Sequence, residues 1–163
     1  MRVVVVCLIT CVCLLTAATS CSDSSPTTIV IPEPPPPPQP KLVAYWNTYA
    51  LDEDYFTWQQ FPVDKTGQIY GYIDLKHWDE HYGLEILLMT TDSFAAYKRG
   101  GAYFAWHKSV YREGQWYFSF PNVAPGNYVL VVDNTDEGWE ETDFDFVNDY
   151  AVFDLKAYYL SSY

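Results

Sequence analysis

Seven acidic residues lie within thirteen positions in the C-terminal third of the chain, and their side chains could bind a metal ion. Carboxylates that crowd together repel one another unless water or a cation compensates them, and calcium accepts about six to eight oxygen ligands in flexible geometry. A calcium site in a loop is therefore one interpretation of the cluster. Its expected ligands are Asp133, Asp136, Glu137 and Glu141; the other members of the cluster are Glu140, Asp143 and Asp145.

Local residue types also favour a simpler interpretation of this segment. An EF-hand loop that began at Asp133 would need Glu at position 144, where the chain has Phe144, so the EF-hand pattern is excluded. Asn134 and Gly138 are turn formers. Asp145 lies between two phenylalanines, an alternation typical of the solvent face of a strand. The alternative to a calcium site is thus a solvated turn followed by an acidic strand.

A second metal-binding pattern, H-x-x-E-H, is formed by His77, Glu80 and His81. In inverted zinc peptidases the two histidines lie on one face of a helix and the glutamate acts as the base. Here the pattern falls between an expected strand that ends at Leu75 and another that begins near Leu84, which leaves room for a loop or at most one helical turn. We interpret it as an exposed polar loop.

Other catalytic patterns are not found in the sequence. It contains no G-x-S-x-G motif for a nucleophilic serine and no glycine-rich phosphate loop. Acids are numerous, but no two of them are marked out as a glycosidase pair. We therefore expect a protein that is not an enzyme, with a metal-dependent hydrolase as the alternative from another class.

Aromatic residues are the other group that could bind a ligand, since they make up 18% of the chain and include 15 Tyr and 6 Trp. Trp78, Tyr82 and Trp139 fall in expected loops, where a ring can stack on a sugar or anchor a protein partner. They are candidate contacts for a polysaccharide or a surface protein, and folding back onto the core is the alternative. Most other aromatic residues have strand spacing and are expected in the core, for example Trp116, Phe118, Phe120 and Tyr128.

Alternating apolar and polar residues predict an all-β domain from position 41 to position 163, because period-two alternation is the pattern of half-buried strands. The expected strands are LVAYWNTY from Leu42, GQIYGYIDL, YGLEILLMT, GAYFAWH, GQWYFSF, NYVLVVDN, FDFV and YAVFDLKAYYL. About eight short strands separated by turn signals predict a single antiparallel β-sandwich of the jelly-roll kind. TTDSFAAYKRGG predicts one short helix over residues 92–99, with Asp92 or Thr91 as N-cap and Gly100 as the stop.

The order of these segments resembles prokaryotic cell-surface β-sandwich domains of the pre-peptidase C-terminal and GOLD-like kinds. In such domains a strand leads into a TxxxFxxYxxG helix, followed later by an aromatic strand, a pGxY turn and a strand that ends in VDNT. The resemblance covers residues 68–156 and implies a non-catalytic accessory or interaction module on an exported protein. The matching positions are Phe94, Tyr97, Gly100, Phe118, Phe120, Pro125, Gly126, Tyr128, Val132, Asp133, Asn134 and Thr135.

The N-terminal part of the chain is typical of an export signal and a tether. An arginine, an apolar run and small residues form a signal peptide over residues 1–20. Cys21 follows and resembles the lipidated cysteine of a bacterial lipoprotein, although Ala18 stands where that family usually has leucine. Plain signal cleavage is the alternative. Residues 21–40 form a Ser/Thr/Pro-rich linker, in which seven prolines between Pro32 and Pro40 favour an extended spacer.

Charge and cysteine positions limit the partners. The chain has 21 acidic and 9 basic residues and a net charge of −12, so it repels phosphate backbones and we expect no nucleic-acid partner. All four cysteines lie in the first 21 residues, so the folded domain has no internal disulfide. The sequence thus predicts an exported, membrane-anchored lipoprotein that faces the periplasm or the cell exterior and has a binding or structural role.

Overall fold

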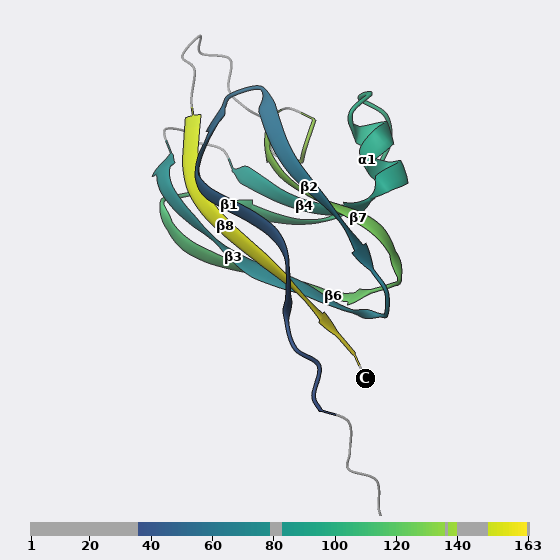
Figure 1. The fold of residues 1–163 in the computed structure, drawn as a ribbon. Coiled ribbons are helices and arrows are strands. Elements are labelled where there is room, and N and C mark those ends of the chain that lie inside the picture. The colour runs from purple at the N-terminus through teal and green to yellow at the C-terminus, as the bar shows by residue number, and fades with distance from the viewer. Residues whose placement is uncertain (1–35, 79–82, 136, 140–149, 163) are drawn as a thin grey trace, which may run out of the picture. The chain divides into compact units, whose positions relative to one another are not determined.

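Eight strands and one short helix account for most of the residues that the computed structural model describes, which are 36–78, 83–135, 137–139 and 150–162 (Figure 1). No helix in this part of the chain is long and apolar enough to cross a membrane. The elements are β1 (Lys41–Asp52), β2 (Tyr55–Val63), β3 (Gly67–Trp78), β4 (Leu84–Thr90), α1 (Thr91–Tyr97), β5 (Ala105–Val110), β6 (Gly114–Val123), β7 (Gly126–Asn134) and β8 (Tyr150–Ser161).

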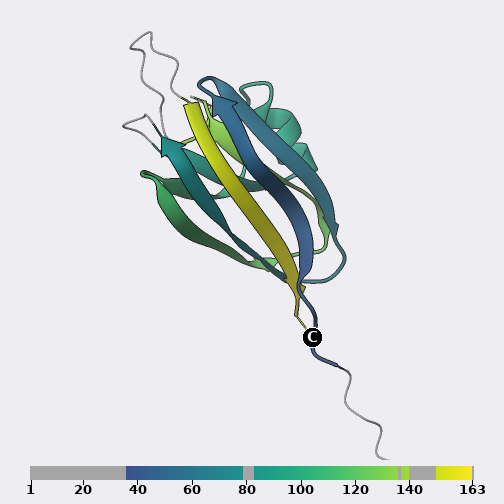
Figure 2. The ribbon, with the colours of Figure 1, turned by 60° about the vertical axis from the view of Figure 1, so that its left-hand side comes forward.

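The strands form two antiparallel sheets of four. The strand order is β1-β8-β3-β6 in the first sheet and β2-β7-β4-β5 in the second. Figure 2 shows the first sheet, with β8 between β1 and β3. This is the strand order of a jelly roll, so the predicted all-β antiparallel sandwich is confirmed.

The main core lies between the two sheets, and the alternation along β3 shows how the sequence builds it. Ile69, Ile73 and Leu75 point inward and are fully buried, whereas Tyr70 and Tyr72 point outward and are half-buried. Each strand of the first sheet therefore gives one apolar face to the core and one mixed face to solvent, as expected for an antiparallel sheet.

The second sheet is covered on both faces, which explains the almost continuous burial of β4 and β7. Helix α1 packs Phe94 and Tyr97 against the outer face of this sheet. There they form a second apolar cluster with residues that include Leu87, Met89 and Val131. Figure 1 shows α1 beside the sheet that contains β4 and β7. Charged side chains on this outer face are therefore removed from water.

The predictions for β2 and for the start of α1 differ from the structure. Strand β2 was not predicted, because Pro62 interrupts its pattern; β2 lies at a sheet edge, where a proline is tolerated. The expected FDFV strand lies outside the described residues. Helix α1 begins at Thr91, and its N-cap is Thr90, whose hydroxyl accepts a hydrogen bond from Ser93 N at 3.2 Å. The prediction of Thr91 or Asp92 as the N-cap was therefore wrong by one or two residues.

Candidate functional site

Five tyrosines gather on the solvent face of the first sheet, and we call this surface the tyrosine face. Its members are Tyr45, Tyr70, Tyr72, Tyr117 and Tyr158. One row runs across all four strands, because Tyr45 pairs with Lys156, Lys156 with Tyr72, and Tyr72 with Tyr117. At about 4.8 Å between neighbouring strands, this row is roughly 14 Å long.

Contacts within the tyrosine face keep its rings side by side. The Tyr70 and Tyr158 rings stack with centroids 5.8 Å apart, and the Tyr72 and Tyr117 centroids are 6.4 Å apart. The Lys156 ammonium lies 5.6 Å from the centroid of Tyr45. Tyr117 remains 70% exposed and Tyr45 44% exposed, so both offer ring surface to a ligand.

Polar groups border the tyrosine face at one end. Asp74 and Asp154 are paired positions on β3 and β8, and Asp154 forms an ion pair of 2.5 Å with Lys76. The Lys76 side chain, and then the main-chain N–H of Thr48, hold the pKa of Asp154 below its ordinary value. This border therefore carries two acids and one lysine, and the lysine is paired with Asp154.

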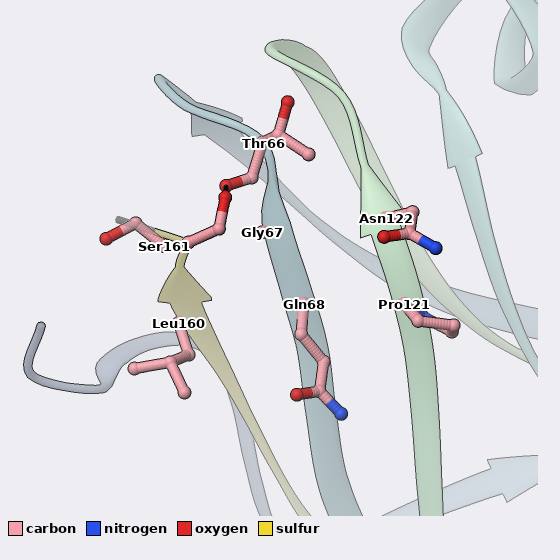
Figure 3. A pocket seen from close by; sticks show the side chains of 8 residues that line it. Thr66, Gly67, Gln68, Pro121, Asn122, Leu160 and Ser161 are labelled. Carbon is pink, nitrogen blue, oxygen red and sulfur yellow. Dashed lines mark hydrogen bonds between the residues drawn. The ribbon is translucent and has the colours of Figure 1, made fainter.

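An open hollow of about 290 Å³ continues the first sheet at its other end (Figure 3). Gln68 and Leu160 are paired positions, and each lies two residues along its strand from Tyr70 or Tyr158. All of the lining residues belong to the described part of the chain, and none is an acid, a base, a histidine or a cysteine. They are Thr66, Gly67, Gln68, Pro121, Asn122, Leu160, Ser161 and Ser162.

The second candidate site is a buried pair of carboxylates on the outer face of the other sheet. Glu85 on β4 and Asp133 on β7 are paired positions in the antiparallel register, and each is only 1% exposed. The Tyr97 hydroxyl from α1 and the hydroxyl of Thr135 lie beside Asp133. No hydrogen bond of good geometry, however, reaches either oxygen of Asp133 or the hydroxyl of Tyr97.

Residues 137–139 form a roof over this pair. The main-chain N–H of Trp139 donates to Glu85 Oε2 at 2.6 Å, and the Tyr103 hydroxyl donates to the carbonyl of Glu137 at 2.8 Å. The Trp139 ring lies 3.7 Å from the ring of His107 on β5, centroid to centroid. The roof is thus attached to β4, to β5 and to the segment between α1 and β5.

Burial dominates the electrostatics beneath the roof. It raises the pKa of Asp133 to about 7; Glu85 adds to this increase, and the Tyr97 and Thr135 hydroxyls oppose it. Burial, and then the charge of Asp133, raise the pKa of Tyr97. The pKa of Tyr103 is raised to about 12; burial is the largest cause, and the charges of Glu85 and Asp133 are smaller ones. Burial and the neighbouring Glu85 therefore disfavour the charged form of Asp133.

The predicted calcium ligands are brought together only in part. Asp133 is buried at the end of β7, whereas Glu137 is exposed in the roof, where its carboxylate lies over Gly100. Asp136 and Glu141 lie outside the described residues. Nowhere in the described ranges do three or more His, Cys, Asp or Glu side chains converge as a group that could bind a metal.

The three predicted ligand aromatics have different environments. Trp78 is the last residue of β3 and packs half-buried against the main core, so the prediction that it lies in a loop was wrong. Trp139 is in the roof and 54% exposed. Tyr82 lies outside the described residues. Trp116, which was expected in the core, is half-buried at the edge of the core, where its ring nitrogen donates to the Arg112 carbonyl at 2.9 Å.

The H-x-x-E-H pattern begins in a strand and not in a loop. His77 belongs to β3, where its ring lies 4.6 Å from that of Tyr150 and its Nδ1 lies 3.7 Å from a carboxylate oxygen of Glu113. The prediction that β3 ends at Leu75 was therefore wrong. The other two pattern residues lie outside the described residues.

Two features of these sites were missed in the sequence. Glu85 is a lone acid within an apolar strand, and a charge at a position expected to be buried was the signal that could have singled it out. The outward tyrosines lie at alternating positions of their strands, but no pattern along the chain shows that the rows from β1, β8, β3 and β6 are adjacent.

No protein-family model and no curated protein matches this chain significantly. The resemblance to pre-peptidase C-terminal and GOLD-like domains therefore stays a prediction from the sequence.

Proposed function

We propose that this protein is an exported lipoprotein, anchored through Cys21, whose β-sandwich binds a neutral polysaccharide at the cell surface without catalysis. The observation that supports this function best is the tyrosine face, together with the hollow at its end. In this proposal the contact aromatics are tyrosines on a sheet and not the aromatic residues expected in loops. A sheet holds its side chains more rigidly than a loop.

The chemistry of the tyrosine face suits a sugar polymer. A sugar ring has apolar C–H faces that can lie on an aromatic ring and hydroxyl groups at its edge, and tyrosine combines an apolar ring with a polar tip. The rings of Tyr45, Tyr72 and Tyr117, from three of the four strands, offer stacking positions along one line. The hollow adds the neutral amides and hydroxyls of Gln68, Asn122 and Ser161, which can hydrogen-bond sugar hydroxyls.

Charge favours an uncharged polymer over an acidic one. The net charge of −12 repels anionic chains over long range, and Asp74 and Asp154 lie next to the tyrosine face. The lysines on this face, Lys76 and Lys156, are already engaged with Asp154 and with the Tyr45 ring. A neutral glycan is not repelled by these negative charges.

The test is a binding assay with the full chain on insoluble cellulose, chitin and xylan, with the acidic polymer alginate for comparison. We expect retention on at least one neutral polymer. Replacing both Tyr72 and Tyr117 by alanine should weaken that binding by about tenfold or more, because aromatic contact residues often contribute over 1 kcal/mol each.

Tyr55→Ala is the matched control, since Tyr55 is 64% exposed on β2 of the other sheet. This variant should bind like the wild type. Failure to bind any neutral polymer, or equal binding by the Tyr72/Tyr117 double variant, would refute glycan binding by the tyrosine face.

A further inference from the structure

We propose that Glu85 and Asp133 bind one calcium ion beneath residues 137–139, on the outer face of the sheet β2-β7-β4-β5. The proposal does not depend on glycan binding, because the two sites lie on different sheets. Two carboxylates in directly paired positions are both removed from water here. Buried charges persist in proteins when they are paired or coordinate a metal.

Buried oxygens without hydrogen-bond donors are the first sign of a ligand. Both carboxylate oxygens of Asp133 and the hydroxyl of Tyr97 lack a hydrogen bond of good geometry. Asp133 and Tyr97 are each 1% exposed, and they approach one another from β7 and from α1. A single hydrogen bond between them would satisfy only one carboxylate oxygen, whereas a cation can be shared by oxygens from both elements.

Gly138 supplies the second sign, which is the close approach of the main chain to both carboxylates. A Cβ atom at this position would lie 1.8 Å from Glu85 Oε2 and 2.7 Å from Asp133 Oδ2. Only a residue without a side chain can therefore approach both carboxylates in this way. The main chain of residues 137–139 therefore lies directly against Glu85 and Asp133, which brings further main-chain oxygens close to both carboxylates.

The donor atoms select the ion. They are carboxylate oxygens with hydroxyl oxygens beside them, which suit a hard cation, and two negative charges balance one divalent ion. Magnesium demands near-ideal octahedral geometry and retains water, whereas calcium accepts irregular sets of oxygens. Since fewer than three acidic side chains converge among the described residues, calcium would complete its shell with hydroxyls, main-chain carbonyls or water.

The experiment is a thermal melt of the full chain in mild detergent, followed by circular dichroism, first in EDTA and then at increasing free calcium in 0.15 M salt. A ligand that binds only the folded state raises its stability. We expect the melting temperature to rise by roughly 10 °C at a calcium concentration a hundred times the dissociation constant. The absence of a rise would overturn the proposal.

Variants separate this site from general attraction of calcium to an acidic protein. Asp133→Asn should abolish the rise and should melt no lower than the wild type in EDTA, because it removes a repulsion between buried carboxylates. Glu85→Gln is the second variant, in case Asp133→Asn does not fold. Asp154→Asn, on the opposite sheet, is the control and should keep the full rise. A full rise in Glu85→Gln or Asp133→Asn, or its loss in Asp154→Asn, would overturn the proposal.

Discussion

Replacing Gly71 by alanine should strongly destabilise the sandwich that presents the tyrosine face. Gly71 lies in β3 between Tyr70 and Tyr72. A Cβ at this position would be 2.0 Å from the carbonyl oxygen of Lys156 on β8 and 2.8 Å from Cζ of Phe118 in the core. The first of these neighbours is a main-chain atom, so it cannot rotate away, and β3 and β8 would have to separate.

The magnitude follows from what must move. Displacing the Phe118 ring from the core would cost at most about 3–5 kcal/mol, the usual loss for truncating a buried phenylalanine. Each ladder hydrogen bond broken between β3 and β8 would add about 1 kcal/mol. We expect a loss of about 3–5 kcal/mol in the free energy of unfolding, a large part of the roughly 5–15 kcal/mol that stabilises a typical domain.

Denaturant unfolding, followed by circular dichroism, measures this loss. Gly126→Ala is the control: a Cβ there first meets the Tyr128 ring at 3.3 Å, a side chain that can adjust, so the change should stay below about 1 kcal/mol. A Gly71→Ala protein within about 1 kcal/mol of the wild type would refute the packing of β3 against β8 and Phe118.

Two further predictions concern the anchor and the acid stability. Cys21→Ala should move the protein from the membrane fraction to the soluble fraction, and retention in membranes would contradict lipid anchoring at this residue. Because Lys76 and the Thr48 N–H lower the pKa of Asp154, its contribution to stability is present above the ordinary aspartate pKa of about 3.9 and is lost as pH falls through the lowered value. Asp154→Asn should therefore flatten the decline of stability below about pH 4, and an unchanged decline would contradict this role.

Most of the sandwich could be predicted because alternation reports which face of a strand is buried. The segments expected around β1, β3, β4, β5, β6, β7 and β8 all contain strands. Strand β2 escaped because its alternation is weak around Pro62, and pairing with β7 over nine residues defines it instead. The short extent predicted for β3 had a similar cause: His77 and Trp78 look like loop residues alone, but they pair with Val152 and Ala151 of β8.

The candidate sites depend on neighbours that only the fold provides. The sequence drew attention to Asp133 because acids follow it, but the acid that pairs with it across the sheet is Glu85, on a strand distant in sequence. Likewise, alternation along β3 puts Tyr70 and Tyr72 on one face, whereas the alignment of Tyr72 with Tyr117 and Lys156 depends on the register of three strands. Register is set by packing of whole strands, so local patterns do not contain it.

The separation of the two proposed sites has a physical consequence. The tyrosine face and the carboxylate pair lie on the outer faces of different sheets, and the main core lies between them. A cation beneath residues 137–139 would connect β4, β7 and α1, none of which belongs to the sheet that presents the tyrosines. Calcium would therefore stabilise the folded domain without changing the arrangement of the glycan-binding rings. Calcium would change the fraction of molecules that are folded, but not the affinity of each folded molecule for glycan. Removal of calcium should therefore lower glycan binding only at temperatures where part of the protein unfolds.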